Sequence, residues 1–90
     1  MPERTVTVGS AVGLHARPAA LFVQAAAAQP VAVTIAKAGT PPVDARSILS
    51  VLGLDARSGD EVVLAAEGAG ADAALDELVA LVARDLDGEG

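Results

Sequence analysis

Polar and apolar residues alternate near the start of the chain and follow helical periods further on. Residues 5–8 read Thr-Val-Thr-Val, which is typical of a half-buried strand. Residues 19–28 are almost all helix formers and predict a helix with an apolar stripe at Ala19, Phe22, Val23 and Ala26. A second amphipathic helix is predicted over residues 71–86, with its stripe at Leu75, Leu78, Val79, Val82 and Leu86.

Short apolar runs bounded by glycine and proline predict the remaining elements. Strands are expected over residues 31–36 and 60–66, and residues 41–44 allow only a short edge strand, because prolines cannot donate to a ladder. Ser47 is suited to cap a short helix through Leu52, with Gly53 as its C-terminal stop. The order strand, helix, strand, strand, short helix, strand, helix predicts an α+β fold with an antiparallel sheet and helices on one face.

Composition narrows the class of protein. The 90 residues suffice for one domain, expected over 1–90, and Phe22 is the only aromatic residue. Without cysteine, neither disulfides nor a thiolate metal site can form. No signal peptide and no apolar run of bilayer length is recognisable, so we expect a cytoplasmic protein that does not insert into membranes.

The charge of the chain is unevenly distributed. The net charge of −6 argues against nucleic acid as a partner. Residues 1–54 hold four bases and two acids, whereas residues 55–90 hold two bases and ten acids. The first part therefore suits an anion or an acidic partner.

The single histidine, His15, stands in the basic part, in the run Gly-Leu-His-Ala-Arg-Pro at residues 13–18. It comes just before a helix expected to start near Ala16, and the free N–H groups and positive dipole of a helix start favour an anion. Arg17 adds a guanidinium able to bond phosphate oxygens, and Pro18 suits the first helical turn. A neutral imidazole is a good nucleophile near neutral pH. These residue types together indicate a histidine that accepts a phosphoryl group, with Ala16 and Arg17 binding the phosphate.

Other uses of a lone histidine have to be weighed. Most lone histidines are surface or capping residues, and the adjacent features that suit an anion are what favour phosphoryl chemistry here. The sequence offers no cysteine, no second histidine and no carboxylate near His15 that could complete a metal site. We therefore expect neither metal nor cofactor. A Ser-His-Asp arrangement would need an acidic partner from a tertiary contact.

Two predicted surfaces lack charge. No charged residue lies between Arg17 and Lys37, although Ala20, Gln24 and Ala27 would face outward if the Phe22 stripe is buried. The segment 47–53 is also uncharged, and exposed apolar surface of this kind tends to mark docking sites. An alanine-rich composition explains Ala20 and Ala27 equally well. It explains the larger side chains less well: Ile48, Leu49 and Leu52.

The run at residues 13–19 resembles the active-site signature of the HPr family, the histidine-containing phosphocarriers of the bacterial phosphoenolpyruvate–sugar phosphotransferase system. Residues 46–54 are similar to the family's regulatory-serine region, and the resemblance extends over the whole chain. It implies an open-faced β-sandwich, with three helices over a four-stranded antiparallel sheet. It also implies that His15 accepts phosphate on Nδ1 from Enzyme I and passes it to EIIA domains, and that Arg17 stabilises the transfer. The implied docking surfaces lie around His15 and on the first two helices.

Ser47 has two interpretations. As an N-cap it needs no further role; as a phosphorylation site it would place negative charge beside Arg46 and weaken apolar docking. The resemblance aligns Ser47 with the target of HPr kinase, which links the carrier to a catabolite regulator. For the protein as a whole, the alternatives to a sugar-branch carrier are a purely regulatory module of the same fold, a carrier in a regulatory nitrogen-type branch and an unrelated ligand-binding domain. Because regulatory family members lack the histidine, the presence of His15 and Arg17 favours a carrier, expected to be monomeric.

Overall fold

The computed structural model describes residues 2–9 and 16–83 of the chain. Within these ranges the elements follow the order that the sequence predicts. They are β1 (Glu3–Thr7), α1 (Ala16–Ala27), β2 (Val33–Lys37), β3 (Val43–Asp44), α2 (Ile48–Gly53), β4 (Glu61–Ala66) and α3 (Ala71–Ala83).

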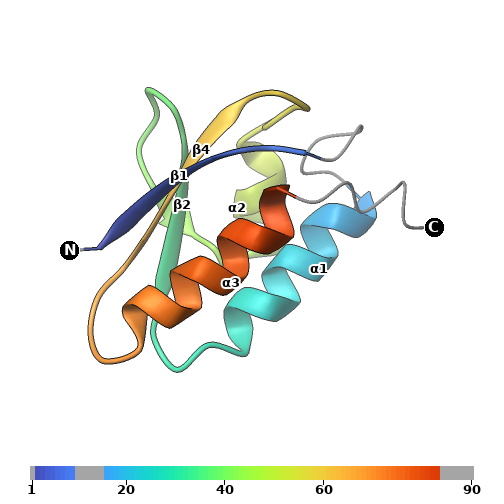
Figure 1. Ribbon diagram of the computed structural model, residues 1–90. Coiled ribbons are helices and arrows are strands. Elements are labelled where there is room, and N and C mark those ends of the chain that lie inside the picture. The colour runs from blue at the N-terminus through green and yellow to red at the C-terminus, as the bar shows by residue number, and fades with distance from the viewer. Residues whose placement is uncertain (1, 10–15, 84–90) are drawn as a thin grey trace.

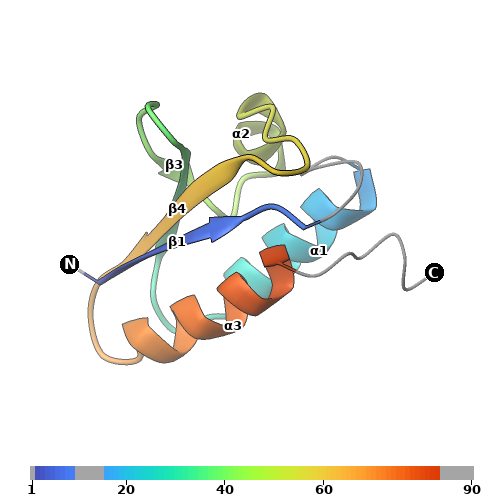
Figure 2. The same ribbon diagram turned by 45° about the horizontal axis from the view of Figure 1, so that its top comes forward.

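The strands form one antiparallel sheet in the order β1-β4-β2-β3. In the interior strand β4, Val63 lies opposite Thr5 of β1 and Ala36 of β2. The two-residue β3 is at the edge, as the prolines before it require. Helices α1 and α3 lie side by side along one face of the sheet, and α2 packs against α1 and β3 (Figure 1; Figure 2). The opposite face is open, so the predicted open-faced α+β sandwich is confirmed.

The core lies between the sheet and the helices and consists almost entirely of small aliphatic side chains. Phe22 of α1 is 1% exposed and is the largest of them. The predicted α1 stripe is confirmed, since Ala19 and Ala26 are buried with Phe22 and Val23 is half-buried. No second aromatic residue is present to fill the volume of Phe22. This single side chain therefore fixes how closely α1 approaches the sheet.

Helix α3 buries one face along its described length. Its buried residues are Ala71, Ala74, Leu75, Leu78 and Val82. Val79, which the predicted stripe included, is only half-buried. The predicted continuation of this helix to Leu86 lies outside the described residues. The helical period thus identified the buried side of α3 correctly, except that Val79 lies at the edge of that side.

Each strand starts one or two residues from its predicted position, with β3 starting at Val43 rather than residue 41 and β4 at Glu61 rather than residue 60. β1 begins at Glu3 rather than residue 5, because Glu3 pairs with Ala65 of β4. Val8 lies beyond the end of β1, but it is buried and its N–H donates to the Asp60 carbonyl at 2.9 Å. β2 begins at Val33 rather than residue 31, because the chain first turns after α1. Pairing with β4, more than apolar composition, decides where these strands start.

The predicted end of α2 at Leu52, with Gly53 as the stop, is wrong by one residue. Gly53 is the last helical residue, and Leu54 continues in right-handed geometry as the C-cap. The left-handed residue is Asp55, with φ 53°. Aspartate tolerates this region better than most residues. Among the contacts of Asp55, Lys37 Nζ donates to its carbonyl at 3.3 Å, and Arg57 pairs with its carboxylate at 3.1 Å.

Candidate functional site

Helix α1 begins at Ala16, the residue that follows His15 in the sequence. Its first turn contains no acidic residue, so no side chain of the turn itself offsets the positive end of the helix dipole. Pro18 is fully buried in this turn, where its missing N–H leaves no acceptor unpaired. His15 itself lies outside the described residues, and its role stays a prediction.

Arg17 is exposed in the first turn of α1. It forms no ion pair with any carboxylate in the ranges 2–9 and 16–83, unlike Arg4, Lys37, Arg46 and Arg57. A guanidinium at a helix N-terminus can donate two parallel hydrogen bonds to an anion that also faces the free N–H groups. The predicted place of Ala16 and Arg17 at a helix start is confirmed, whereas their binding of phosphate stays a prediction.

Backbone hydrogen bonds bring three segments together at one end of the molecule. Val8 N–H donates to Asp60 O at 2.9 Å, and Gly59 N–H donates to Val8 O at 3.0 Å. Gly9 N–H donates to Val82 O of α3 at 3.0 Å. Figure 1 shows the blue first turn of α1 at the same end as the red last turn of α3. Three segments therefore support the end of the molecule where α1 starts: the exit of β1, the α2–β4 connection and the C-terminal turn of α3.

Ser47 caps α2, as predicted. Its backbone is extended and its Oγ accepts a hydrogen bond from Ser50 N–H at 3.3 Å. The Ser47 C=O also accepts the first helical bond, from Val51 N–H at 2.9 Å. This geometry satisfies the capping interpretation of Ser47.

The positive charge beside Ser47 already has a partner, which the sequence analysis did not assign. Arg46 Nε and Nη2 each donate to the Asp44 carboxylate at 3.2 Å, and Arg46 N–H donates to Asp44 Oδ1 at 2.9 Å. The Arg46 side chain lowers the pKa of the Asp44 carboxyl, and the backbone hydrogen bond lowers it further. The sequence did carry a signal for this ion pair, because an acid and an arginine, Asp44 and Arg46, stand two residues apart in a loop.

The residues predicted to form a docking surface are exposed to different degrees. Leu49 is 79% exposed and Ile48 is 38% exposed on α2. Leu52 is less exposed than these two residues: it is half-buried, because it packs against the core. On α1, Gln24 is exposed and Ala20 is half-buried. Since α1 and α2 contact each other, these residues occupy neighbouring helices, but their function as a docking surface stays a prediction.

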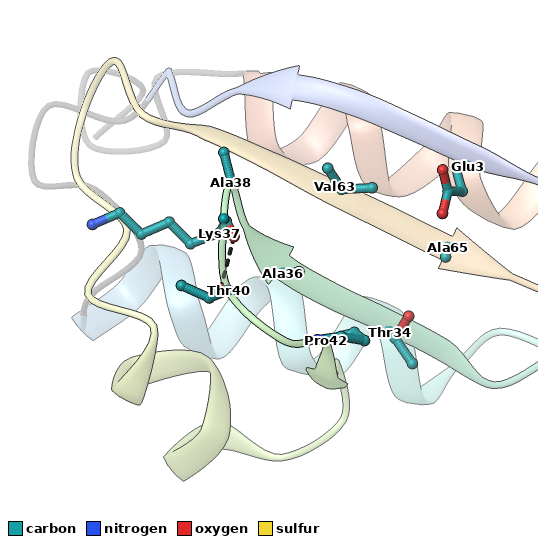
Figure 3. A pocket seen from close by; sticks show the side chains of 10 residues that line it. Glu3, Thr34, Ala36, Lys37, Ala38, Thr40, Pro42, Val63 and Ala65 are labelled. Carbon is teal, nitrogen blue, oxygen red and sulfur yellow. Dashed lines mark hydrogen bonds between the residues drawn. The ribbon is translucent and has the colours of Figure 1, made fainter.

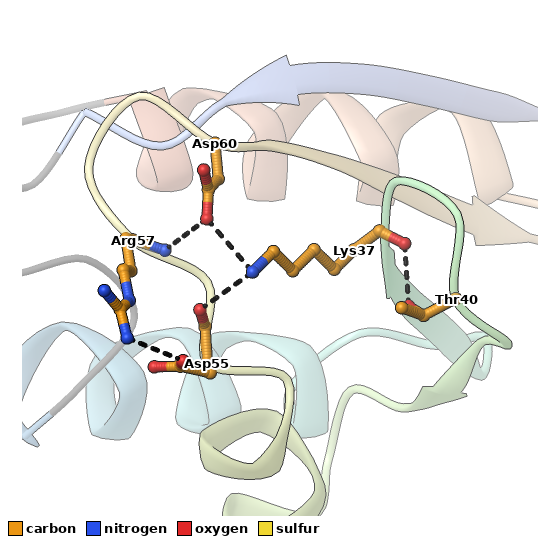
Figure 4. Close-up of polar contacts among 5 residues, drawn as sticks. All are labelled: Lys37, Thr40, Asp55, Arg57 and Asp60. Atoms are coloured by element: carbon orange, nitrogen blue, oxygen red, sulfur yellow. Dashed lines mark hydrogen bonds and ion pairs between the residues drawn. The ribbon is translucent and has the colours of Figure 1, made fainter.

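The α2–β4 connection holds a group of polar contacts that the sequence analysis missed. Lys37 of β2 reaches across to Asp60 Oδ2 at 3.3 Å and to Asp55 O, as Figure 4 shows. Arg57 N–H donates to Asp60 Oδ2 at 2.9 Å, and its guanidinium pairs with Asp55. The Arg57 N–H, and then the Lys37 side chain, lower the pKa of the Asp60 carboxyl. Lys37 comes from a distant segment and left no local signal, whereas the spacing of Asp55, Arg57 and Asp60 was visible in the sequence.

A hollow of about 420 Å³ lies on the open face of the sheet, across the sheet from the helices. Ala36, Val63 and Ala65 line it, and Thr34 contributes a hydroxyl. In Figure 3 the Lys37 amine extends away from the hollow toward the α2–β4 connection.

Within the part of the chain that the structure describes, no three His, Asp or Glu side chains come together in a way that could hold a metal ion. None of the helices described is both long and apolar enough to cross a bilayer.

Comparison with known proteins decides the family. The family model described as the PTS HPr component phosphorylation site matches residues 2–84. The chain belongs to the HPr family. HPr proteins are phosphocarriers of the phosphotransferase system, so the resemblance seen in the sequence is confirmed.

Individual HPr proteins match nearly the whole chain. Phosphocarrier protein HPr of Streptomyces coelicolor is 59% identical over 87 residues, which cover 97% of this chain and 94% of that protein. The crystal structure of HPr from Bacillus anthracis is 38% identical, with a TM-score of 0.85 over 90% of this chain and 95% of the other. The helices and strands of this chain therefore correspond to the HPr architecture.

Some members of the HPr family form dimers. The crystal structure of Crh from Bacillus subtilis, described as a dimer with a swapped domain, is 41% identical to this chain. Its TM-score is 0.70 over 91% of this chain and 93% of that one. The expected monomer therefore stays a prediction for this member of the family.

Proposed function

We propose that this HPr-family protein carries a phosphoryl group on His15 between Enzyme I, charged by phosphoenolpyruvate, and the EIIA domains of sugar permeases. The observation that carries the proposal is the exposed guanidinium of Arg17, which pairs with no carboxylate within residues 2–9 and 16–83, in an acid-free first turn of α1 directly after His15 in the sequence. The relay would run in the cytoplasm, with the carrier as a monomer that docks on each partner in turn.

The transfer step follows from the chemistry of the residues. A neutral imidazole nitrogen of His15 attacks the phosphorus, an N–P bond forms, and the bond between the phosphorus and the donor's leaving atom breaks. Charge in the transition state spreads over the phosphoryl oxygens, where a guanidinium and helix N–H groups stabilise it. Ala16 N–H and Arg17 would supply these donors, and the reverse attack by a nucleophile of the acceptor would complete the relay.

A reconstituted relay tests this proposal. Purified Enzyme I, an EIIA domain and phosphoenolpyruvate are mixed with or without this protein, and phosphorylation of EIIA is followed. Phosphorylation that requires the protein in catalytic amounts supports the carrier role. Phosphorylation that proceeds equally without it contradicts the role.

Regulation through Ser47 is a second proposal, in which HPr kinase phosphorylates Ser47 and a catabolite regulator binds the product. Its support is the exposed pair Ile48 and Leu49 next to Ser47. Against it, the Ser47 hydroxyl caps α2, and Arg46 is engaged by Asp44. Phosphate on Ser47 would also lie near the Asp44 carboxylate, so we rank this role below the relay through His15. Mass spectrometry after incubation with an HPr kinase and ATP tests it, and an unmodified Ser47 would argue against it.

A further inference from the structure

We infer that the hollow on the open face of the sheet binds a linear aliphatic amine, with an ammonium group on the Glu3 carboxylate and the alkyl chain over a floor of small side chains. This binding site goes beyond phosphoryl transfer and does not depend on it. Three observations on the described residues support it: the shape of the hollow, the chemistry of its lining and the placement of charge around it.

The floor of the hollow consists of small side chains on two neighbouring strands. Ala65 of β4 lies opposite Thr34 of β2, and Val63 lies opposite Ala36. These four residues alternate with buried core residues of the same strands, so their side chains point away from the helices. The two alanines carry only a methyl group, which leaves a volume of about 420 Å³ above the sheet. Sites for small molecules typically have volumes of about 300–1,000 Å³.

The sides of the hollow differ in chemistry. Figure 3 shows Glu3 on the β1 side and Pro42 on the β3 side. Glu3 pairs with Ala65 in the sheet, so its side chain lies on the same face as the floor. Pro42 adds apolar surface, and Thr34 adds a hydroxyl that can accept a hydrogen bond. The hollow therefore combines a hydrocarbon surface with acceptor oxygens at one place.

The charge of the lining selects a cation. Within residues 2–9 and 16–83, the Glu3 carboxylate has no ion pair and no hydrogen bond. The guanidinium of the adjacent Arg4 is engaged by Asp72 of α3 at 3.1 Å. Lys37 also lines the hollow, but its amine binds Asp60 at 3.3 Å and extends away from the hollow in Figure 3. Among the described residues, the hollow therefore holds one carboxylate that no cation neutralises.

The lining also decides which kind of cation fits. A divalent metal ion needs several oxygen ligands, and a quaternary ammonium group is best held by aromatic rings. The hollow offers one carboxylate, and the only aromatic residue, Phe22, is buried in the core. An ammonium group can donate to both Glu3 and Thr34, while its alkyl chain covers the apolar floor. A second copy of this chain is disfavoured, because Glu61 lies on the same face of the sheet as Glu3 and like charges would meet.

Titration with cadaverine, a linear five-carbon diamine, followed by the NMR chemical shifts of the amides, tests the inference. Physiological salt screens diffuse attraction to the acidic protein. We expect saturable shifts at the residues that line the hollow, and Glu3→Gln should raise the Kd about threefold or more. The matched control is Glu61→Gln, which removes the same charge from the same face of the sheet outside the hollow. Ala36→Leu fills the floor and should also weaken binding, although no charge changes.

Each contrary outcome overturns a defined part of the inference. Equal weakening by Glu3→Gln and Glu61→Gln would mean that only the negative charge of the face attracts the amine. Unchanged binding to Ala36→Leu, or shifts confined to α3, would overturn the hollow as the place of binding. Pentanediol that binds as well as cadaverine would overturn the role of the Glu3 carboxylate. Binding of N-acetyl-lysine amide without binding of cadaverine would assign the hollow to a lysine side chain of another protein and overturn the free amine. A thermal melt of each variant verifies that the fold is retained before Kd values are compared.

Discussion

Gly9 lies so close to the C-terminal turn of α3 that a β-carbon at this position would overlap the carbonyl oxygen of Ala83. The N–H of Gly9 also donates to the carbonyl oxygen of Val82. A side chain is excluded at Gly9 by this close approach of two backbones. The contact joins the exit of β1 to the last described turn of α3, at the end of the molecule where α1 starts.

The Gly9 contact predicts a loss of stability on the smallest possible substitution. We expect Gly9→Ala to lower the free energy of unfolding by about 1–3 kcal/mol, because the two backbones must separate. Urea denaturation followed by circular dichroism measures the change. Gly53→Ala is the matched control, since a β-carbon there meets nothing within 4 Å and helical alanine is favoured over glycine. Equal stability of the wild-type protein and Gly9→Ala would contradict the contact.

Arg17 is predicted to affect transfer and not folding. The side chain is exposed and has no ion-pair partner among the described residues, so Arg17→Ala should change the free energy of unfolding by less than about 0.5 kcal/mol. Loss of a charge-assisted hydrogen bond to the phosphoryl group should slow phosphorylation about 10- to 100-fold. Rapid-quench measurement of phosphoryl transfer from Enzyme I determines the rate. A wild-type rate would show that backbone N–H groups alone hold the anion.

Asp60 is predicted to make the stability of the protein sensitive to acid. The Arg57 N–H and the Lys37 ammonium lower the pKa of its carboxyl in the folded state relative to the unfolded state. A lowered folded-state pKa gives stability that is present above the unfolded pKa of about 4 and is lost as the pH falls through the folded value. We therefore expect Asp60→Asn to be less stable than wild type at pH 7 and to lose less stability on acidification.

Urea midpoints measured between pH 7 and about pH 2 test the role of Asp60. Asp44→Asn is a useful comparison, because Arg46 lowers the pKa of the Asp44 carboxyl at a separate site. If wild type and Asp60→Asn respond to acid with parallel curves, the contacts of Asp60 contribute no measurable acid dependence.

The parts of the fold that depend on local periodicity could be predicted from the sequence. Burial of one helix face repeats every three or four residues, so the stripe around Phe22 was visible in the order of residues alone. The capping role of Ser47 was visible for a similar reason, because a cap depends on neighbours within one turn. The place of Arg17 in the first turn of α1 was visible as well, because the helix start was predicted near Ala16.

The parts that depend on distant segments could not be predicted. Whether strand β2 starts at residue 31 or 33 is decided by its pairing with β4. The left-handed residue is Asp55, two positions beyond the last helical residue Gly53, and the contact to its carbonyl comes from Lys37 of the distant strand β2. The restriction at Gly9 comes from α3, near the other end of the chain. None of these relationships leaves a signal in neighbouring residues.

Transfer of label from phosphoenolpyruvate through Enzyme I to this protein tests the central claim most directly. We predict one phosphoryl group per chain, labile in acid and stable in alkali, which is absent in His15→Ala and retained at a reduced rate in Arg17→Ala. His15→Ala should keep the circular dichroism spectrum of the wild-type protein, so that loss of label reports on the nucleophile. Undiminished labelling of His15→Ala, or an acid-stable label, would contradict phosphoryl transfer through His15.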